Sequence, residues 1–438
     1  MNFYRTFGKI IILTLTLCLP ACGPSAPPIP TQSPVTLQPA FIEDPNTACF
    51  YHKPSGAFTC LDREGWHIYQ PDENWTVKDL SVFTHCADGR TYLGSRDGIL
   101  AVGQESAAWI PASPFIGDGD LIACGPGSEF WVSMIFGGIF HYDGEKWISI
   151  EKASTNMEER TGFVIAPNGV AWLATSERIA SYNGSQWQSF EKGKGFDADL
   201  SSHYNWLNEL AVDSSGTIWA GTVTGLIKYD GDRWSTVNGV TECVYGVIVS
   251  GDDQVWIATL TDIYTLDPKA NRLVQVLKGE SEANKIKAMQ FDRQGRLWVA
   301  ADYGLSVYDG TTWTVYHMDT ADIFANSAFG LFVLGDGPNL PALAKKATGS
   351  VSANFGAQNA GKQVEICVIP PPIIYSEKTP CSNQPFHQVT AIKPDGSIFF
   401  QNLPVGRYYS VLQKDINSVL WSFSASFLVN PGEETKLG

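Results

Sequence analysis

Basic residues and histidines are scarce in this chain of 438 residues. It has 30 Lys and Arg against 45 Asp and Glu, a formal net charge of −15, and only 7 His. An acidic surface repels phosphate backbones, so the composition argues against a nucleic-acid-binding protein. The histidines are scattered, and no pair is spaced i, i+4 on a helical pattern, so nothing in their placement favours a metal site.

Motifs of common catalytic and cofactor sites are also missing. The chain has no Gly-x-Ser-x-Gly nucleophile elbow, no phosphate loop and no pair of Cys-x-x-Cys motifs that could hold zinc. The acidic pairs Asp118-Gly-Asp120 and Asp252-Asp253 lack the spacing of a calcium loop and predict turns. We therefore expect no metal, no cofactor, and a binding protein rather than an enzyme.

A long hydrophobic run occurs only near the N-terminus, at residues 10–19 behind Arg5 and Lys9. It is too short to span a bilayer as a stable helix, so residues 1–22 are predicted to be a signal peptide. The run ends in Leu-Pro-Ala-Cys22, which resembles the lipobox of bacterial lipoproteins, although Pro20 departs from the small residue usual there. The resemblance implies that Cys22 is acylated and anchors the protein at the cell surface or outer membrane. The alternative is an ordinary secretory signal that contains a cysteine.

Residues 23–46 hold seven prolines among Ser, Thr and Gln. This composition cannot form a packed core and favours extended conformations, so we interpret the segment as a tether. Loss of Arg5 and Lys9 with the signal would take the formal charge from −15 to −17.

A stretch of about 40 residues recurs along the middle of the chain, and its clearest copy is residues 296–316. Residues 297–300 and 305–308 predict two strands, Asp309-Gly310 predicts a hairpin turn, and Trp313 begins a third strand. Six further copies align on the corresponding positions: Phe50, Leu61 and Trp66; Tyr92, Val102 and Trp109; Trp131, Tyr142 and Trp147; Trp172, Tyr182 and Trp187; Trp219, Tyr229 and Trp234; Trp256, Leu266 and Leu273. Their spacing of 38 to 47 residues is the size of a four-stranded propeller blade.

Each copy except the first is preceded by one more apolar run, such as residues 209–213, which predicts the inner strand of a blade. The missing run follows the seventh copy at residues 327–334, so we expect a ring closed by a strand from its C-terminal end. Outer strands of neighbouring blades diverge, and we interpret the repeated Trp as filling these gaps rather than binding a ligand. The sequence thus predicts an all-β chain, with a seven-bladed propeller at residues 47–336 and a linker at 337–348.

The copy formed by Ile218-Trp-Ala-Gly-Thr222, Gly225-Leu226 and Tyr229-Asp-Gly231 resembles the propeller repeat of bacterial two-component regulators. The resemblance extends over about residues 47–336 and implies the propeller fold. In that family the propeller is usually an extracytoplasmic sensor joined to a membrane helix and a kinase. This sequence shows neither, so we infer no signalling role.

A second pattern begins near residue 349. It resembles the carboxypeptidase regulatory-like domain, whose signature is Asp-Gly-x-Phe followed by Leu-Pro-x-Gly-x-Tyr. The matching residues are Asp395, Gly396, Phe399, Leu403, Pro404, Gly406 and Tyr408. The resemblance implies a small prealbumin-like β-sandwich over residues 349–438, an accessory module without the zinc ligands of the peptidase.

Nine cysteines fit an oxidising compartment. A two-residue loop at Pro54-Ser55 would place Cys49 opposite Cys60, which predicts a disulfide between them. Cys18 would be lost with the signal, and Cys243 is left over. Two more candidate pairs come from like positions in adjacent blades and from the C-terminal domain: Cys86 with Cys124, and Cys367 with Cys381.

The longest connection between copies contains residues 192–206 and joins the outer strand of one blade to the inner strand of the next. His203, Tyr204 and Trp206 place aromatic rings beside hydrogen-bonding groups, which suits a carbohydrate or a peptide. Trp75, Arg178 and Tyr303 belong to other loops expected on the same face and complete the candidate binding set. The alternative is that Trp206 packs under its own loop.

We therefore expect a lipid-anchored extracytoplasmic protein that recognises a glycan, a protein or a peptide with this loop face. One alternative is a polysaccharide lyase or hydrolase acting at the central face of the propeller. Its acid and base groups would come from Asp72, Glu73, Glu177, Asp197, Asp199 and His203. A second alternative is a structural surface module without a small ligand.

Overall fold

The computed structural model describes residues 44–437 with gaps. The residues outside the description are 1–43, 53–56, 70–81, 87–89, 96–97, 103–106, 112–118, 126–128, 135–137, 151–159, 176–177, 192–209, 279–284, 302–303, 318–327, 344–347, 368–379, 382–386, 418–419, 424–426, 431 and 438. No helix in the described part is long and apolar enough to cross a membrane.

Seven four-stranded antiparallel sheets form the blades of a propeller in the described part of the chain. The first blade combines strands from both ends of the propeller: β28 (Ala328–Val333), β1 (Ala48–His52), β2 (Ala57–Asp62) and β3 (Gly65–Tyr69). In the other blades the strands follow the order of the chain, from the inner to the outer edge. The second blade contains β4 (Val82–His85), β5 (Thr91–Ser95), β6 (Gly98–Val102) and β7 (Ala107–Pro111). The third contains β8 (Gly119–Cys124), β9 (Phe130–Met134), β10 (Gly138–Tyr142) and β11 (Trp147–Ile150).

The remaining blades repeat this arrangement. The fourth contains β12 (Arg160–Ile165), β13 (Ala171–Thr175), β14 (Arg178–Tyr182) and β15 (Trp187–Glu191). The fifth contains β16 (Leu210–Val212), β17 (Ile218–Thr222), β18 (Gly225–Tyr229) and β19 (Trp234–Val237). The sixth contains β20 (Gly246–Val249), β21 (Val255–Ala258), β22 (Ile263–Asp267) and β23 (Arg272–Leu277). The seventh contains β24 (Ile286–Phe291), β25 (Leu297–Ala301), β26 (Gly304–Tyr308) and β27 (Trp313–His317).

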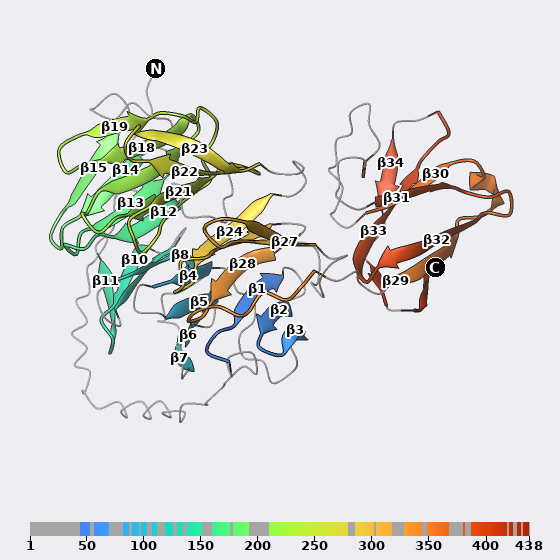
Figure 1. The fold of residues 1–438 in the computed structure, drawn as a ribbon, viewed down its shortest axis with the longest axis horizontal. Coiled ribbons are helices and arrows are strands. Elements are labelled where there is room, and N and C mark those ends of the chain that lie inside the picture. Colours follow the sequence, from blue (N-terminus) through green and yellow to red (C-terminus); the bar gives the residue numbers. More distant parts are fainter. Residues whose placement is uncertain are drawn as a thin grey trace, which may run out of the picture. The chain divides into compact units, whose positions relative to one another are not determined.

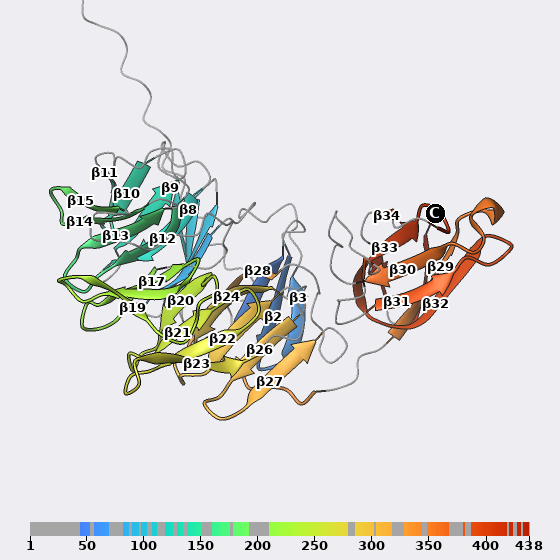
Figure 2. The same ribbon diagram turned by 90° about the horizontal axis from the view of Figure 1, so that it is seen from above.

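The inner strands form a closed ring, in which β28 lies between β24 of the seventh blade and β4 of the second. β28 also pairs with β1, with Leu331 opposite Phe50, as the repeat pattern predicts. Figure 1 shows the orange β28 beside the blue β1, although some 280 residues separate them in sequence. In Figure 2 the blue β2 and β3 lie next to β26 and β27 of the seventh blade. The two ends of the propeller therefore complete one blade, and no inner edge is left open between the first blade and the seventh.

A hydrophobic cluster fills each of the seven blade-to-blade interfaces in the described structure. The outer-strand Trp of a blade packs into the interface with the preceding blade. Trp66 meets Tyr316 of the seventh blade edge-on at a centroid distance of 5.5 Å. Trp313 reaches the sixth blade, where its Nε1 donates to the Val276 carbonyl at 3.1 Å. The prediction that these Trp are packing residues is confirmed, because their rings fill the space where the blades diverge.

The turns between third and outer strands use the Asp-Gly and Asn-Gly pairs that the sequence predicts. Gly310 has φ +96°, a conformation that glycine adopts without steric cost. Asp309 Oδ1 accepts hydrogen bonds from the N–H groups of Thr311 and Thr312, both at 2.8 Å. Such backbone hydrogen bonds lower the pKa of the Asp143, Asp230 and Asp309 carboxyls. Because these pKa values are lower in the folded state, the carboxylates stabilise the fold above about pH 4 and lose that contribution as the pH falls further.

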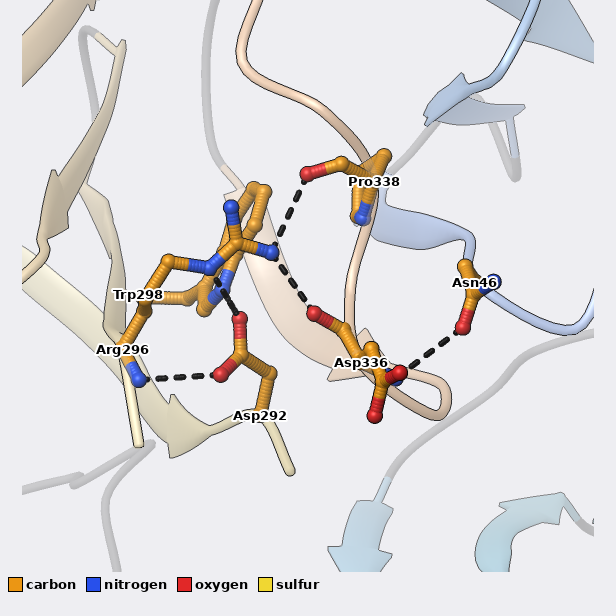
Figure 3. Close-up of polar contacts among 6 residues, drawn as sticks. All are labelled: Asn46, Asp292, Arg296, Trp298, Asp336 and Pro338. Atoms are coloured by element: carbon orange, nitrogen blue, oxygen red, sulfur yellow. Dashed lines mark hydrogen bonds and ion pairs between the residues drawn. The ribbon is translucent and has the colours of Figure 1, made fainter. Parts of the chain in front are cut away.

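A polar network closes the ring at the end that carries these turns (Figure 3). Asp292 lies between β24 and β25, and its Oδ2 accepts from Arg296 Nε at 2.6 Å and from Trp298 Nε1 at 2.8 Å. Arg296 Nη2 donates onward to the carbonyls of Asp336 at 2.7 Å and Pro338 at 3.1 Å. The Asp336 N–H in turn donates to Asn46 Oδ1 at 3.0 Å. This closure network therefore joins the seventh blade, the segment before β1 and the segment after β28.

The first part of the predicted linker is packed against the propeller. Gly337 and Pro338 are buried, and the fully buried Tyr316 donates its hydroxyl hydrogen to the Pro341 carbonyl at 2.8 Å. A Cβ at Gly337 would lie 2.7 Å from both Arg296 Nη2 and Asp292 Oδ2, so only glycine fits beside the closure network. The sequence placed residues 337–348 in a linker because Pro338 and Pro341 exclude regular structure, but their carbonyls still accept hydrogen bonds.

The three predicted cysteine pairs are disulfide-bonded in the structure. Cys49 and Cys60 lie directly opposite each other on β1 and β2. Cys86 and Cys124 join the ends of the inner strands of the second and third blades, and Cys367 joins Cys381 in the C-terminal domain. Cys243 forms no disulfide with the described cysteines.

The C-terminal domain is a two-sheet β-sandwich. One sheet has the order β32 (Ser397–Pro404), β29 (Thr348–Asn354), β36 (Glu434–Leu437). The other has the order β31 (His387–Ala391), β30 (Gln363–Cys367), β33 (Gly406–Gln413), β34 (Trp421–Phe423), with β35 (Phe427–Val429) also paired to β33. A single 3₁₀ turn, η2 (Ala357–Asn359), follows β29 in the described part. Val351 and Phe400 of the first sheet share one core cluster with Ile366 of the second.

One residue of the predicted signature is placed differently in the structure. Phe399 was matched to the conserved Phe, but it is 46% exposed, whereas its neighbours Ile398 and Phe400 are each 2% exposed. Successive strand residues face opposite sides of a sheet, so Phe399 faces solvent while its two neighbours face the core. Ile398, three residues after Asp395, faces the core. Leu403 and Tyr408 are buried as the match implies, and the Tyr408 hydroxyl donates to the Pro404 carbonyl at 2.9 Å.

Candidate functional site

We call the end of the propeller at which the sequence predicts the candidate residues the connection face. There the second strand of each blade turns into the third, and the outer strand leaves for the next blade. His203, Tyr204 and Trp206 (within 192–209), Trp75 (within 70–81) and Tyr303 (within 302–303) lie outside the described residues. Cys22, the predicted lipidation site, also lies outside them. Arg178 is therefore the one candidate ligand-binding residue that the structure places.

Arg178 lies opposite the residue after which the longest connection begins. It is the first residue of β14 and its Cα partner is Glu191, the last residue of β15 before segment 192–209. The hydroxyl of Thr175 accepts from the Arg178 N–H at 3.1 Å and donates to its carbonyl at 3.2 Å. This local bonding holds the Arg178 backbone beside the start of the segment that carries Tyr204 and Trp206.

A second arginine at the same end was missed by the sequence reasoning. Arg160 is the first residue of β12, its Cα partner is Thr175, and it is only 7% exposed. Its Nη1 donates to the Gly138 carbonyl of the third blade at 3.1 Å, which ties two blades together. A guanidinium is buried only when it is hydrogen-bonded, so Arg160 is primarily an anchor for this part of the face. In the sequence, Arg160 follows two glutamates, which is typical of a charged loop. Only its position in the blade alignment, at the start of an inner strand, could have identified it.

Hydroxyl groups recur at the ends of second strands, where they form hydrogen bonds within the turns that follow. Thr222 donates to the Gly225 carbonyl at 2.8 Å, and Ser95 donates to the Gly98 carbonyl at 3.1 Å. Both side chains are almost fully buried, as are Thr175 and Thr259 at the equivalent positions. The Ser or Thr that recurs at this position therefore stabilises the turns of the blades.

An acidic group of side chains occupies the described part of this face between the fifth and sixth blades. The Tyr264 hydroxyl donates to Glu242 Oε1 at 3.0 Å. Burial, together with the nearby Glu242, raises the pKa of Tyr264 to about 12, so the hydroxyl keeps its proton. Asp262 Oδ2 accepts from Gln275 Nε2 at 2.7 Å. These groups can accept further hydrogen bonds from hydroxyl or ammonium groups, and the sequence reasoning did not identify them because they belong to different strands.

The described residues contain two close pairs of a histidine and a carboxylate. They contain no group of three or more His, Cys, Asp or Glu placed to hold a metal ion. His141 and Glu129 lie 3.2 Å apart, as do His67 and Asp62, but both pairs are at the opposite end of the blades from the connection face. The carboxylates of the predicted enzyme alternative at positions 72, 73, 177, 197 and 199 lie outside the described residues, as does His203.

No family model and no curated protein sequence matches this chain. Among solved structures, it is similar to the extracellular domain of a putative hybrid two-component system from B. thetaiotaomicron, with 15% identity and a TM-score of 0.47, over 88% of this chain and 61% of that one. It is also similar to a surface component of the type-IX secretion system of Porphyromonas gingivalis, with 14% identity and a TM-score of 0.47, over 87% and 64% of the two chains. A streptogramin B lyase aligns with 10% identity and a TM-score of 0.47, over 62% and 90%. This chain thus spans about three fifths of the length of the first two proteins, and at such identities no residue role passes from any of them to it.

Proposed function

We propose that this chain is a lipid-anchored extracytoplasmic protein that binds a glycan through the connection face of its propeller. The observation that carries the proposal is the position of Arg178 opposite Glu191. Glu191 directly precedes the connection that contains His203, Tyr204 and Trp206. A guanidinium beside aromatic rings can hydrogen-bond sugar hydroxyls while the rings stack on the sugar. The acidic group around Glu242 and Tyr264 on the same face favours a neutral ligand over an anionic one. A basic peptide would meet the same chemistry and is the alternative ligand.

The extracytoplasmic location is supported by the signal-like N-terminus and by three disulfides, which persist in oxidising compartments. These three disulfides account for six of the cysteines in the chain. The anchor itself depends on the likeness of residues 19–22 to a lipobox.

Trp206→Ala should weaken ligand binding while leaving the melting temperature nearly unchanged. Loss of a stacking aromatic costs about 1–3 kcal/mol, or roughly 5- to 150-fold in Kd. A glycan array and a peptide pull-down with the mature chain would identify the ligand, and titration of the variant would measure the loss.

Trp187→Ala is the matched control, because Trp187 packs 5.1 Å from Tyr182 in a blade interface. It should lower the melting temperature and leave the affinity of the folded fraction unchanged. If Trp206→Ala instead melted early, Trp206 would be a core residue. Unchanged affinity in that variant would place the site elsewhere.

Cys22→Ala should move the protein from the membrane fraction to a soluble fraction or the medium, because an acylated Cys22 would be its anchor. Fractionation and incorporation of a labelled fatty acid would test this. Cys18→Ala is the control and should keep both the label and the membrane location, since Cys18 precedes the predicted cleavage site. Absence of label in the wild type, with Cys22→Ala still wholly in the membrane fraction, would contradict the anchor.

A further inference from the structure

Phe399 is a large aromatic residue that the core of the sandwich does not use. It lies in the middle of β32, and 46% of it is exposed while Ile398 and Phe400 fill the core. Residues 397–401 alternate as the pleat requires, so the exposure of Phe399 results from its position on the outer face of the sheet and not from fraying.

Polar side chains lie beside this ring on the outer face of the sheet formed by β32, β29 and β36. Ser352 is the Cα partner of Phe399 on β29, and Lys436 is the partner of Ser352 on β36, so the three form one row across the sheet. Ser350 pairs with Glu434 in the next row, and Gln401 is exposed two residues beyond Phe399. The Ser352 hydroxyl donates to Glu434 Oε1, which orients that carboxylate beside the row.

We propose that this face of the sandwich binds a neutral polysaccharide, with Phe399 as the stacking ring. The platform consists of Ser350, Ser352, Phe399, Gln401, Glu434 and Lys436. The ring offers an apolar surface to the CH face of a sugar, and the hydroxyl, amide and charged groups on either side can bond its hydroxyls. Glu434 and Lys436 have opposite charges, so the platform favours neither an acidic nor a basic polymer.

The composition of the platform argues against a protein partner. Protein interfaces bury their central aromatic residue within a ring of contacts that exclude water. On the β29 side, the residues next to Phe399 across the sheet are serine and lysine, so the ring has polar neighbours there. A single ring among hydrogen-bonding groups matches a sugar unit better than the apolar centre of a protein interface.

Affinity gel electrophoresis of the full mature chain tests the proposal. Gels containing laminarin, hydroxyethylcellulose, xyloglucan or mannan serve as the probes. We expect at least one of these polymers to retard the wild type, Phe399→Ala to raise the Kd about tenfold, and Phe399→Tyr to keep the binding because it retains the ring. The melting temperature should stay the same in both variants, since the side chain lies outside the core.

Leu428→Ala is the matched control. Leu428 is 40% exposed on β35, which pairs with the other sheet, so its loss should not change the retardation. A wild type that none of the four polymers retards, or equal binding by Phe399→Ala, would overturn the proposal. Binding that survives in Phe399→Ala and disappears in Trp206→Ala would assign the polymer to the propeller and also overturn the site on the sandwich.

Discussion

A chain that ends at Met318 should not form a stable propeller, whereas one that ends at Lys346 should fold without the sandwich. The shorter chain lacks β28, and with it the inner strand of the first blade. It would expose the edge of β1 and open two interfaces, because Phe332 and Leu334 belong to one neighbouring cluster and Leu331 and Val333 to the other.

The expected loss is large compared with the stability of a domain. Each of these four side chains is at least 95% buried, and burying one contributes about 1.5–3 kcal/mol. Together they represent about 6–12 kcal/mol, which is close to the whole unfolding free energy of a typical domain, 5–15 kcal/mol. Thermal melting and size-exclusion chromatography should therefore show an aggregated or early-melting protein.

A chain that ends at Asp336 separates the effect of β28 from that of the segment after it. It keeps β28 but loses the Pro338 and Pro341 carbonyls that Arg296 and Tyr316 contact. Two lost hydrogen bonds to buried groups should cost about 2–5 kcal/mol, so this chain should melt between the other two. If all three chains melted together and cooperatively, the closure by β28 would be wrong.

Asp292→Ala should be the most destabilising single substitution in the closure network. The Asp292 side chain is fully buried and that of Arg296 is 13% exposed, so the substitution leaves a nearly buried guanidinium without its carboxylate. It also removes the acceptor of Trp298 Nε1. Breaking a buried pair from one side costs about 3–5 kcal/mol, which urea denaturation would measure as a lower midpoint.

Asp213→Ala in the fifth blade is the matched control. Asp213 bonds Trp219 Nε1 at 3.0 Å and the Thr217 N–H at 2.9 Å, just as Asp292 bonds Trp298 and the Arg296 N–H, but Thr217 stands where the seventh blade has Arg296. Burial raises the pKa of the Asp213 carboxyl. Hydrogen bonds from Ser215, Trp219 and Thr217 lower it by more, so this pKa lies below its ordinary value. Loss of this carboxylate should cost about 1–2 kcal/mol, the value of the hydrogen bonds that it accepts within the turn. Equal losses for the two substitutions would mean that the ion pair adds nothing to ring closure.

Most of the fold could be predicted because its signals are local and recur. A turn such as Asp309-Gly310 depends on two residues, and a Trp at a fixed distance from it marks an outer strand wherever the blade repeats. The closing strand could be placed by counting, since one copy lacked an inner strand and one apolar run was left over. The Cys49–Cys60 pair followed from the length of a single hairpin loop.

The candidate site could be predicted only as a region. Loop length identified segment 192–206, but no local pattern indicated that Arg160 and Arg178 would lie on either side of Thr175, because these contacts form between different strands. Glu242 and Tyr264 came together in the same way, from a connection and a strand 22 residues apart.

By itself, the sequence determined the number of blades and the Cys49–Cys60 pair, because periodicity and turn chemistry depend on residues close together in the chain. Counting the copies identified the closing strand, and the other two cysteine pairs followed from like positions in adjacent blades and from a shared domain. Tertiary structure decided what depends on register and on distant segments. It placed Phe399 on the outer face of its sheet, between two residues that face the core. The first part of the predicted linker also packs against the propeller. The Pro338 and Pro341 carbonyls accept hydrogen bonds from Arg296 and Tyr316, which lie close to them only in the closed ring.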